Sequence, residues 1–132
     1  IIAENQEYQK GMLTSIQCGL RAVPDGTDAV MVLLGDQPMV NGPIIDKLAD
    51  TFRHTDKGIL IAVHKGKRGH PIIINTKYKR HIEQLGSENS MHDFTRKFAS
   101  EILEVETGTT EVLKDIDTPE DYNKEIKYRR LS

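Results

Sequence analysis

The segment Ala29–Leu34 constrains the fold of this chain more than any other. It is a continuous apolar run with two valines, bounded on both sides by turn residues. Such a run is typical of a strand buried on both faces, as in parallel sheets. Ile59–Val63 is a second run of this kind, and Pro71–Asn75 predicts a third strand after the loop HKGKRGH. We therefore expect at least three strands in one buried sheet.

Apolar residues at helical spacing lie between these runs. One stripe precedes the first strand, a second helix is expected after Asn41-Gly42-Pro43, and Ser90 with Asp93 resembles a capping box for a third. Ile102–Val105 alternates like a strand, and Thr118 is placed to cap a last helix. This order predicts an open, mostly parallel α/β sheet with helices on both faces. The first helical stripe consists of Leu13, Ile16, Leu20 and Val23.

Length, charge and cysteine content limit the number of domains and the classes of partner to be expected. The 132 residues fit a single domain, and a net charge of −2 gives no reason to expect a nucleic-acid or membrane partner. A lone cysteine, Cys18, cannot form an internal disulfide and is expected to be a small buried side chain, so a cytoplasmic protein is the natural expectation. The five histidines lack metal-ligand spacing, which argues against zinc.

Asp36 lies two residues beyond the apolar run, in the sequence LLGDQPMV. In open α/β sheets ligands gather beyond the carboxyl ends of the strands. A hard cation such as Mg²⁺ prefers oxygen ligands and takes one or two carboxylates together with substrate phosphates. Asp36 is therefore a candidate metal ligand, and the alternative is that it only caps the turn before Pro38.

A second acidic stretch, KDIDTPEDY, places Ile116 between Asp115 and Asp117. In an extended segment both aspartates would face the same way. The alternative is ordinary helix-start chemistry, since Asp and Thr commonly precede Pro-Glu-Asp. The spacing leaves open whether the two acidic stretches converge on one ion.

Two further stretches are weaker candidates for anion binding. The glycine-containing loop with Lys65, Lys67 and Arg68 could approach a phosphate, although a solvated turn is the simpler interpretation. Gly11 with Ser15 at a helix start could contact an anion or a base, or could simply cap the helix.

Four stretches in this order, GMLTSIQCGL, LLGDQPMV, KRGHPIII and DIDTPEDY, resemble the MobA-like nucleotidyltransferases. The Asp-Gln-Pro motif and the Asp-Ile-Asp-Thr-Pro-Glu-Asp ending are similar to those of the molybdenum cofactor cytidylyltransferases. The resemblance implies a Rossmann-like, nucleotide-diphospho-sugar transferase fold. It also implies attack of a cofactor phosphate on the α-phosphate of CTP, with Mg²⁺ as cofactor and release of pyrophosphate.

The resemblance also implies roles for individual residues. Asp36 and Asp117 would be the catalytic residues and the Mg²⁺ ligands. Gln37 would belong to the cytidine-type variant of the motif, which favours CTP over GTP. The nucleotide-binding set would be Gly11, Ser15, Gly35 and Gln37, and the wall on the pterin side would be Gly69, His70 and Pro71. The partners would be an NTP and a pterin cofactor, and a molybdoenzyme could be a further partner.

Two departures from the family pattern limit this resemblance. The first strand and the Gly-rich loop with Arg and Lys are absent, and the chain begins without methionine. We therefore expect residues 1–132 to be the C-terminal two-thirds of a single domain, inactive in nucleotide transfer by itself. In addition, LGSENSMHDF stands where the family often has Gly-Asp-x-Gly-x-Arg, which leaves the acceptor open.

Two other functions fit the same residues. A non-catalytic nucleotide-binding or regulatory module could retain the scaffold without the phosphate loop. A nucleotidyltransferase acting on a sugar phosphate or alcohol phosphate could also share it.

Overall fold

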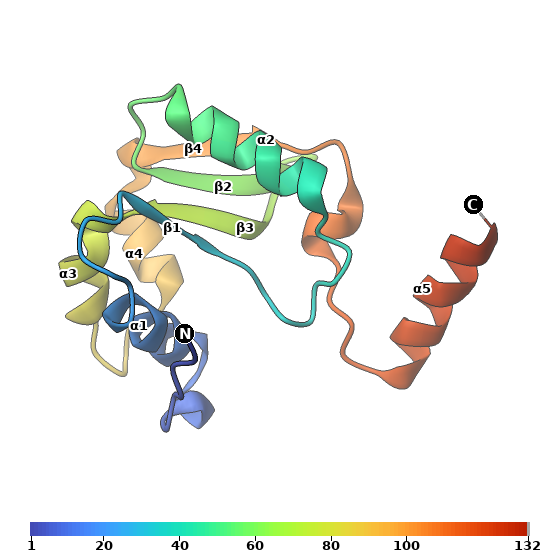
Figure 1. Cartoon of the computed structure of the whole chain (residues 1–132), viewed down its shortest axis with the longest axis horizontal. Helices are drawn as coiled ribbons and strands as arrows, with labels where there is room; N and C mark the ends of the chain where they lie inside the picture. Colours follow the sequence, from blue (N-terminus) through green and yellow to red (C-terminus); the bar gives the residue numbers. More distant parts are fainter. Residues whose placement is uncertain (132) are drawn as a thin grey trace.

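A computed structural model describes residues 1–131 of the chain (Figure 1). Its centre is an open four-stranded sheet with strand order β1-β3-β2-β4. The α/β class and the open sheet predicted from the sequence are confirmed. The strands are β1 (Ala29–Val32), β2 (Ile59–His64), β3 (Lys67–Asn75) and β4 (Ile102–Glu106).

The strand directions correct the expectation of a mostly parallel sheet. β2 and β4 pair in parallel, but β3 is antiparallel to both β1 and β2, so the sheet is mixed. The cause is the connection between β2 and β3. Lys65 and Gly66 form a two-residue turn with φ of 49° and 78°, and such turns join antiparallel strands. The expected HKGKRGH loop is therefore a β-hairpin whose second strand begins at Lys67.

Helices cover both faces of the sheet, as predicted (Figure 1). α1, α3 and α4 pack on one face, α2 lies on the other, and α5 stands away from the sheet. The α-helices are α1 (Met12–Arg21), α2 (Gly42–Arg53), α3 (Lys79–Glu83), α4 (Met91–Lys97) and α5 (Pro119–Leu131). The 3₁₀ helices are η1 (Tyr8–Lys10), η2 (Thr76–Tyr78), η3 (Ala99–Glu101) and η4 (Thr110–Leu113).

Strand β2 shows why the sequence folds in this way. Its side chains alternate between the two faces, with Ile59 and Ile61 in the core beneath α1 and Leu60 and Ala62 in the core beneath α2. All four are at most 2% exposed. Because each face of the strand is covered, every position must be apolar, which accounts for the uninterrupted run.

Strand β1 differs from what its sequence predicts. It ends at Val32 rather than Leu34, all four of its residues are only partly buried, and Leu33 beyond it is 50% exposed. Within residues 1–131 it pairs only with β3, so it is an edge strand. An apolar run alone does not tell a central strand from an edge strand.

The predicted helix starts are confirmed. The Ser90 and Asp93 side chains form a capping box at α4. The Asn41 side chain accepts from the backbone N–H of Ile44 at the start of α2. At α5, Thr118 Oγ1 accepts from the backbone N–H of Asp121 at 3.1 Å. These side-chain oxygens satisfy backbone donors that the first turn of a helix leaves free.

Candidate functional site

The carboxyl ends of β1, β2 and β4 lie at one edge of the sheet. β2 is parallel to β4, and both β1 and β2 are antiparallel to β3, so the three strands run in the same direction. The segments that follow them are the loop with Asp36, the β2–β3 hairpin and the chain from Thr107 onward. This is the edge at which the sequence predicted a ligand site.

The structure brings the two acidic stretches side by side. The backbone N–H of Ile116 donates to the backbone carbonyl of Asp36 at 2.8 Å. Asp36 and Asp117 are both exposed residues. The spacing left open whether the two acidic stretches converge. Their backbones do meet in the loop after β1, although Asp36 and Ile116 are about 80 positions apart. That the carboxylates of Asp36 and Asp117 share one metal ion stays a prediction.

Gln37 faces inward from the same loop. It is only 6% exposed, and its Nε2 donates to Asp115 Oδ1 at 2.6 Å. Its other amide atom, Oε1, is buried without a hydrogen-bond partner among residues 1–131. Gly35, in contrast, lies exposed in the turn before Asp36. Asp115 therefore joins the site as a residue that the role assignments by resemblance left out.

Gly69, His70 and Pro71 lie in β3, next to the chain that leads to the second acidic stretch. A Cβ atom added to Gly69 would lie 2.0 Å from the carbonyl oxygen of Val112 in η4, so this position accommodates only glycine. Pro71 is fully buried. Packing thus explains Gly69 and Pro71 here, while contact with a pterin stays a prediction.

His70 links β3 electrostatically to both acidic stretches. Burial lowers the pKa of its imidazole, while the charges of Asp115 and Asp36 oppose that shift. His70 Nε2 is buried and has no hydrogen-bond partner within the described part of the chain. The site therefore contains two buried polar atoms, Gln37 Oε1 and His70 Nε2, whose hydrogen-bonding capacity is unused.

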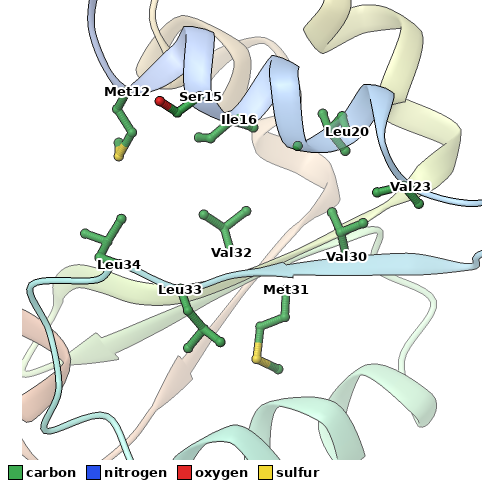
Figure 2. Close-up of a pocket in the computed structure, with 11 residues that line it drawn as sticks. Met12, Ser15, Ile16, Leu20, Val23, Val30, Met31, Val32, Leu33 and Leu34 are labelled. Atoms are coloured by element: carbon green, nitrogen blue, oxygen red, sulfur yellow. The ribbon is translucent and has the colours of Figure 1, made fainter. Parts of the chain in front are cut away.

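A groove of about 510 Å³ runs between α1 and β1 (Figure 2). Met12 and Ser15 lie over its end near Leu34, and Val23 lies over the end near Val30. Ser15 Oγ also accepts from Asn5 Nδ2 at 2.9 Å. The groove thus leads along the strand to the residue before Gly35 and the Asp36 loop. Its other lining residues are Ile16, Gly19, Leu20, Met31, Val32 and Leu33.

Gly11 is the residue before α1, where its φ of 108° lies in the region that favours glycine. Thr14 Oγ1 donates to its carbonyl at 2.8 Å. The backbone conformation at the start of α1 therefore explains why a glycine occupies position 11. Its predicted contact with a nucleotide stays a prediction.

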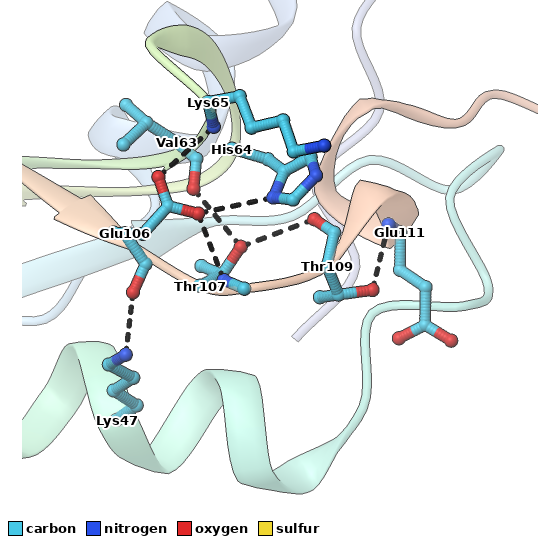
Figure 3. A network of polar contacts seen from close by, with 9 residues as sticks. Lys47, Val63, His64, Lys65, Glu106, Thr107, Thr109 and Glu111 are labelled. Atoms are coloured by element: carbon cyan, nitrogen blue, oxygen red, sulfur yellow. Dashed lines mark hydrogen bonds and ion pairs between the residues drawn. The ribbon is translucent and has the colours of Figure 1, made fainter.

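The hairpin is fastened to the end of β4 by Glu106 (Figure 3). The Glu106 carboxylate accepts from the backbone N–H groups of Lys65 and Gly108 and contacts His64 Nδ1 at 3.1 Å. Its backbone carbonyl accepts from Lys47 Nζ of α2 at 2.5 Å. The strand pattern predicted β4 but gave no sign of this network, because it joins residues far apart in the sequence.

The cationic loop fits the simpler of its two interpretations. Lys65 forms the hairpin turn, and Arg68 Nε contacts Glu104 Oε1 at 2.6 Å across the sheet. Arg68 thus already has an acidic partner on β4, which favours a structural role for it.

Residues 1–131 contain neither a preformed metal cluster nor a membrane-spanning helix. No group of three or more His, Cys, Asp and Glu side chains has an arrangement that could hold a metal by itself. A magnesium site here would need substrate oxygens in addition to Asp36 and Asp117. In the same residues, no helix is both long and apolar enough to cross a membrane.

Comparison with known proteins supports a nucleotidyltransferase. Molybdenum cofactor cytidylyltransferase of Escherichia coli K12 is 27% identical over 121 residues, which cover 92% of this chain and 59% of that protein. The bifunctional protein GlmU of Francisella tularensis subsp. holarctica is 27% identical over 110 residues, covering 83% of this chain and 23% of that protein. The chain thus spans about three-fifths of the first relative and a smaller part of the second.

Solved structures show the same fold. Rv0371c from Mycobacterium tuberculosis H37Rv has a TM-score of 0.73 at 19% identity, covering 87% of this chain and 59% of that one. A complex of Rv0371C with manganese gives 0.68 at 18% identity, with coverage of 86% and 59%. 4-Diphosphocytidyl-2C-methyl-D-erythritol synthase from Anaerococcus prevotii gives 0.73 at 15% identity, with coverage of 91% and 64%. Residues 1–104 match the MobA-like NTP transferase domain, and the chain belongs to this family of nucleotidyltransferases.

Proposed function

We propose that this chain contributes the metal and acceptor side of a Mg²⁺-dependent nucleotidyltransferase that transfers CMP from CTP to the phosphate of a molybdopterin-type cofactor. The observation that carries the proposal is the contact between the Asp36 loop and the segment Asp115–Asp117, made by the 2.8 Å bond from Ile116 N–H to the Asp36 carbonyl. The similarity to a molybdenum cofactor cytidylyltransferase over 92% of the chain supports the substrates.

The reaction needs little covalent chemistry from the protein. An oxygen of the acceptor phosphate forms a bond to the α-phosphorus of CTP, and the bond from that phosphorus to the bridging oxygen of pyrophosphate breaks. Mg²⁺, when bound, offsets the negative charge that gathers on the phosphoryl oxygens. Asp36 and Asp117 are exposed carboxylates on adjacent segments, a donor set that suits a hard cation shared with substrate oxygens.

The groove between α1 and β1 is the proposed place for the base and ribose. Ser15 and Met12 lie over the end that leads toward the Asp36 loop (Figure 2). A nucleoside there would direct its phosphates to the edge of the sheet where the acidic residues lie. Gly69 and Pro71, packed against Val112 and in the core, would then form the wall that holds His70 beside the acceptor.

A second function deserves a direct test. GlmU and the erythritol synthase are similar to this chain over comparable lengths, which favours a sugar-phosphate or alcohol-phosphate acceptor on the same scaffold. Release of pyrophosphate from CTP or GTP separates these possibilities when the chain is supplied with the N-terminal part of a relative's domain and is assayed with a molybdopterin, a sugar phosphate or a methylerythritol phosphate as acceptor. A non-catalytic module would bind the nucleotide but would release no pyrophosphate with any acceptor, even with the N-terminal part of a relative's domain present.

The metal assignment can be tested on this chain by calorimetric titration with Mg²⁺ and CTP. Asp36→Asn should weaken binding at least about tenfold, equivalent to about 1.4 kcal/mol. Asp117→Asn should have a smaller effect, and both variants should melt within about 2 °C of the wild type, because neither residue is buried.

Asp46→Asn is the matched control, since Asp46 is an exposed carboxylate on α2 that belongs to neither acidic stretch. It should leave both the affinity and the melting temperature unchanged. If Asp36→Asn melts much lower and still binds Mg²⁺ and CTP as the wild type does, Asp36 is a turn cap and the metal assignment is wrong.

A further inference from the structure

We propose that Gln37 is a positioning residue: it holds Asp115, and through it the segment before α5, against the strand-end loop, so that Asp36 and Asp117 face the same ligand. This inference rests on the proposed function for the identity of that ligand. It departs from the role in nucleotide choice that the resemblance implies for Gln37.

Burial is the first step of the argument. Gln37 is 6% exposed although the residues on both sides of it, Asp36 and Pro38, are exposed. Its only free polar atom, Oε1, is itself buried. A side chain placed in this way offers little surface to a nucleotide, and its amide nitrogen is already engaged by Asp115.

The second step is the two-point attachment. Residues 36 and 37 contact residues 116 and 115, one pair through the backbone at 2.8 Å and the other through side chains at 2.6 Å. Two adjacent bonds fix the orientation of a segment as well as its distance. A bond from an amide N–H to a carboxylate is also stronger than one between neutral groups. Asp117 is the next residue, so its direction follows from this attachment.

The third step concerns what else could hold the segment. Upstream, Val112 is fully buried and anchors η4. Downstream, α5 contains no buried residue. The ion pair between Lys114 and Glu125, with 3.8 Å between Nζ and Oε2, is partly exposed, and such pairs contribute little. Between Val112 and α5, the bonds made by Gln37 and Asp36 are therefore the restraints nearest to Asp117. Beyond Asp117, α5 contacts the same loop where Arg129 Nη2 donates to Met39 Sδ at 2.9 Å.

Three variants separate this role from the alternatives. Gln37→Met keeps a long side chain but removes the donor, and Asp115→Ala removes the acceptor. Asp115→Asn removes the charge but keeps an Oδ1 that can accept from Gln37 Nε2. Gln17→Met is the matched control: Gln17 Nε2 also bridges two segments, donating to the carbonyls of Ile82 and Leu85 at 2.9 and 3.0 Å, but outside the acidic site.

Two measurements are made on each variant of the 132-residue chain. Amide hydrogen exchange of Ile116, followed by NMR, reports whether its N–H still bonds to the Asp36 carbonyl. Calorimetric titration with Mg²⁺ and CTP reports whether the acidic residues still act together. Global unfolding free energies, measured in denaturant, correct the exchange rates for overall loss of stability.

Gln37→Met and Asp115→Ala should each raise Ile116 exchange at least about tenfold beyond the global correction and weaken Mg²⁺–CTP binding to the same extent. The double variant should be no worse than either single one, because both remove the same bond. Asp115→Asn should lie between the wild type and Asp115→Ala in both measurements, because it keeps the acceptor but loses the charge that strengthens the bond. Gln17→Met should lower stability without selectively exposing Ile116.

Unchanged Ile116 exchange in Gln37→Met overturns the proposal. So does an Asp115→Asn variant as impaired as Asp115→Ala, since Asp115 would then act through its own charge. If the wild-type chain binds no Mg²⁺ and CTP, the proposed function fails in this chain, and the exchange of Ile116 alone decides whether Gln37 positions the segment.

Discussion

Replacing Gly69 by alanine tests the packing that carries the second acidic stretch. The added Cβ would lie 2.0 Å from the carbonyl oxygen of Val112 and 2.9 Å from Leu113 Cδ2. Because such atoms do not approach closer than 3.0 Å, β3 and η4 must move apart by about 1 Å. The carbonyl belongs to the backbone, so no side-chain rotation relieves the contact.

The cost follows from what η4 contributes. Val112 is fully buried in the core beneath α2. A radial gap of this size forfeits roughly a quarter to a half of the attraction between the atoms concerned, and overpacking of a core costs about 1–3 kcal/mol. For a domain of this size we expect a decrease in melting temperature of about 3–6 °C for each kcal/mol.

Displacing η4 should also affect the site, because the chain runs from Val112 directly to Asp115 and Asp117. Thermal unfolding by circular dichroism and titration with Mg²⁺ and CTP measure the two effects. Gly42→Ala is the control, since a Cβ there meets no atom within 4 Å. A Gly69→Ala variant that melts within about 1 °C of the wild type refutes the steric reasoning. One that melts lower but binds Mg²⁺ and CTP normally refutes the link to the acidic residues.

Two further predictions concern stability. Gly108 N–H, together with His64 and Lys65, holds the pKa of Glu106 below its usual 4.5, so its contribution to stability is complete above that pH and is lost as the pH falls through the lower folded value. Glu106→Gln should flatten this part of the stability–pH curve measured by urea denaturation, and an unchanged curve would contradict the network. Leu48→Ala in α2 should cost about 2–5 kcal/mol, because Leu48 is fully buried; a loss below about 1 kcal/mol would show that the core closes around the gap.

The central elements could be predicted because local sequence determines them. β2 is buried on both faces from Ile59 to Val63, so these positions are all apolar and mark the strand in the sequence. The start of α4 was equally clear, since Ser90 and Asp93 satisfy each other's backbone donors within four residues. In both cases the information lies within one element.

The direction of β3 was missed because its signal is weak. A two-residue hairpin turn requires positive φ, for which Asn-Gly and Asp-Gly are the usual sequences. Here the first position is Lys65, with a φ of 49°, so only Gly66 marked the turn. The edge position of β1 was missed for another reason: the number of neighbours of a strand depends on pairings elsewhere in the chain.

Asp36 could be predicted as a candidate site residue from its place after a strand, whereas the bond between Gln37 and Asp115 was not foreseeable. The partners are 78 residues apart, and no local pattern relates a glutamine in a turn to an aspartate before a helix. Of the two aspartates in the second stretch, resemblance selected Asp117. The structure adds Asp115 because only the folded chain shows which one the loop holds.

The sequence Gly-Asp-Gln-Pro after an apolar strand therefore serves two purposes at consecutive positions. The loop turns back toward the core, so that Asp36 is exposed while Gln37 and Met39 are buried. Asp36 presents a carboxylate, and Gln37 holds in place the segment that carries the carboxylate of Asp117. Loss of charge at Asp36 and loss of the donor at Gln37 should therefore weaken the same binding event through different physical causes. Only the second should release the Ile116 amide to exchange.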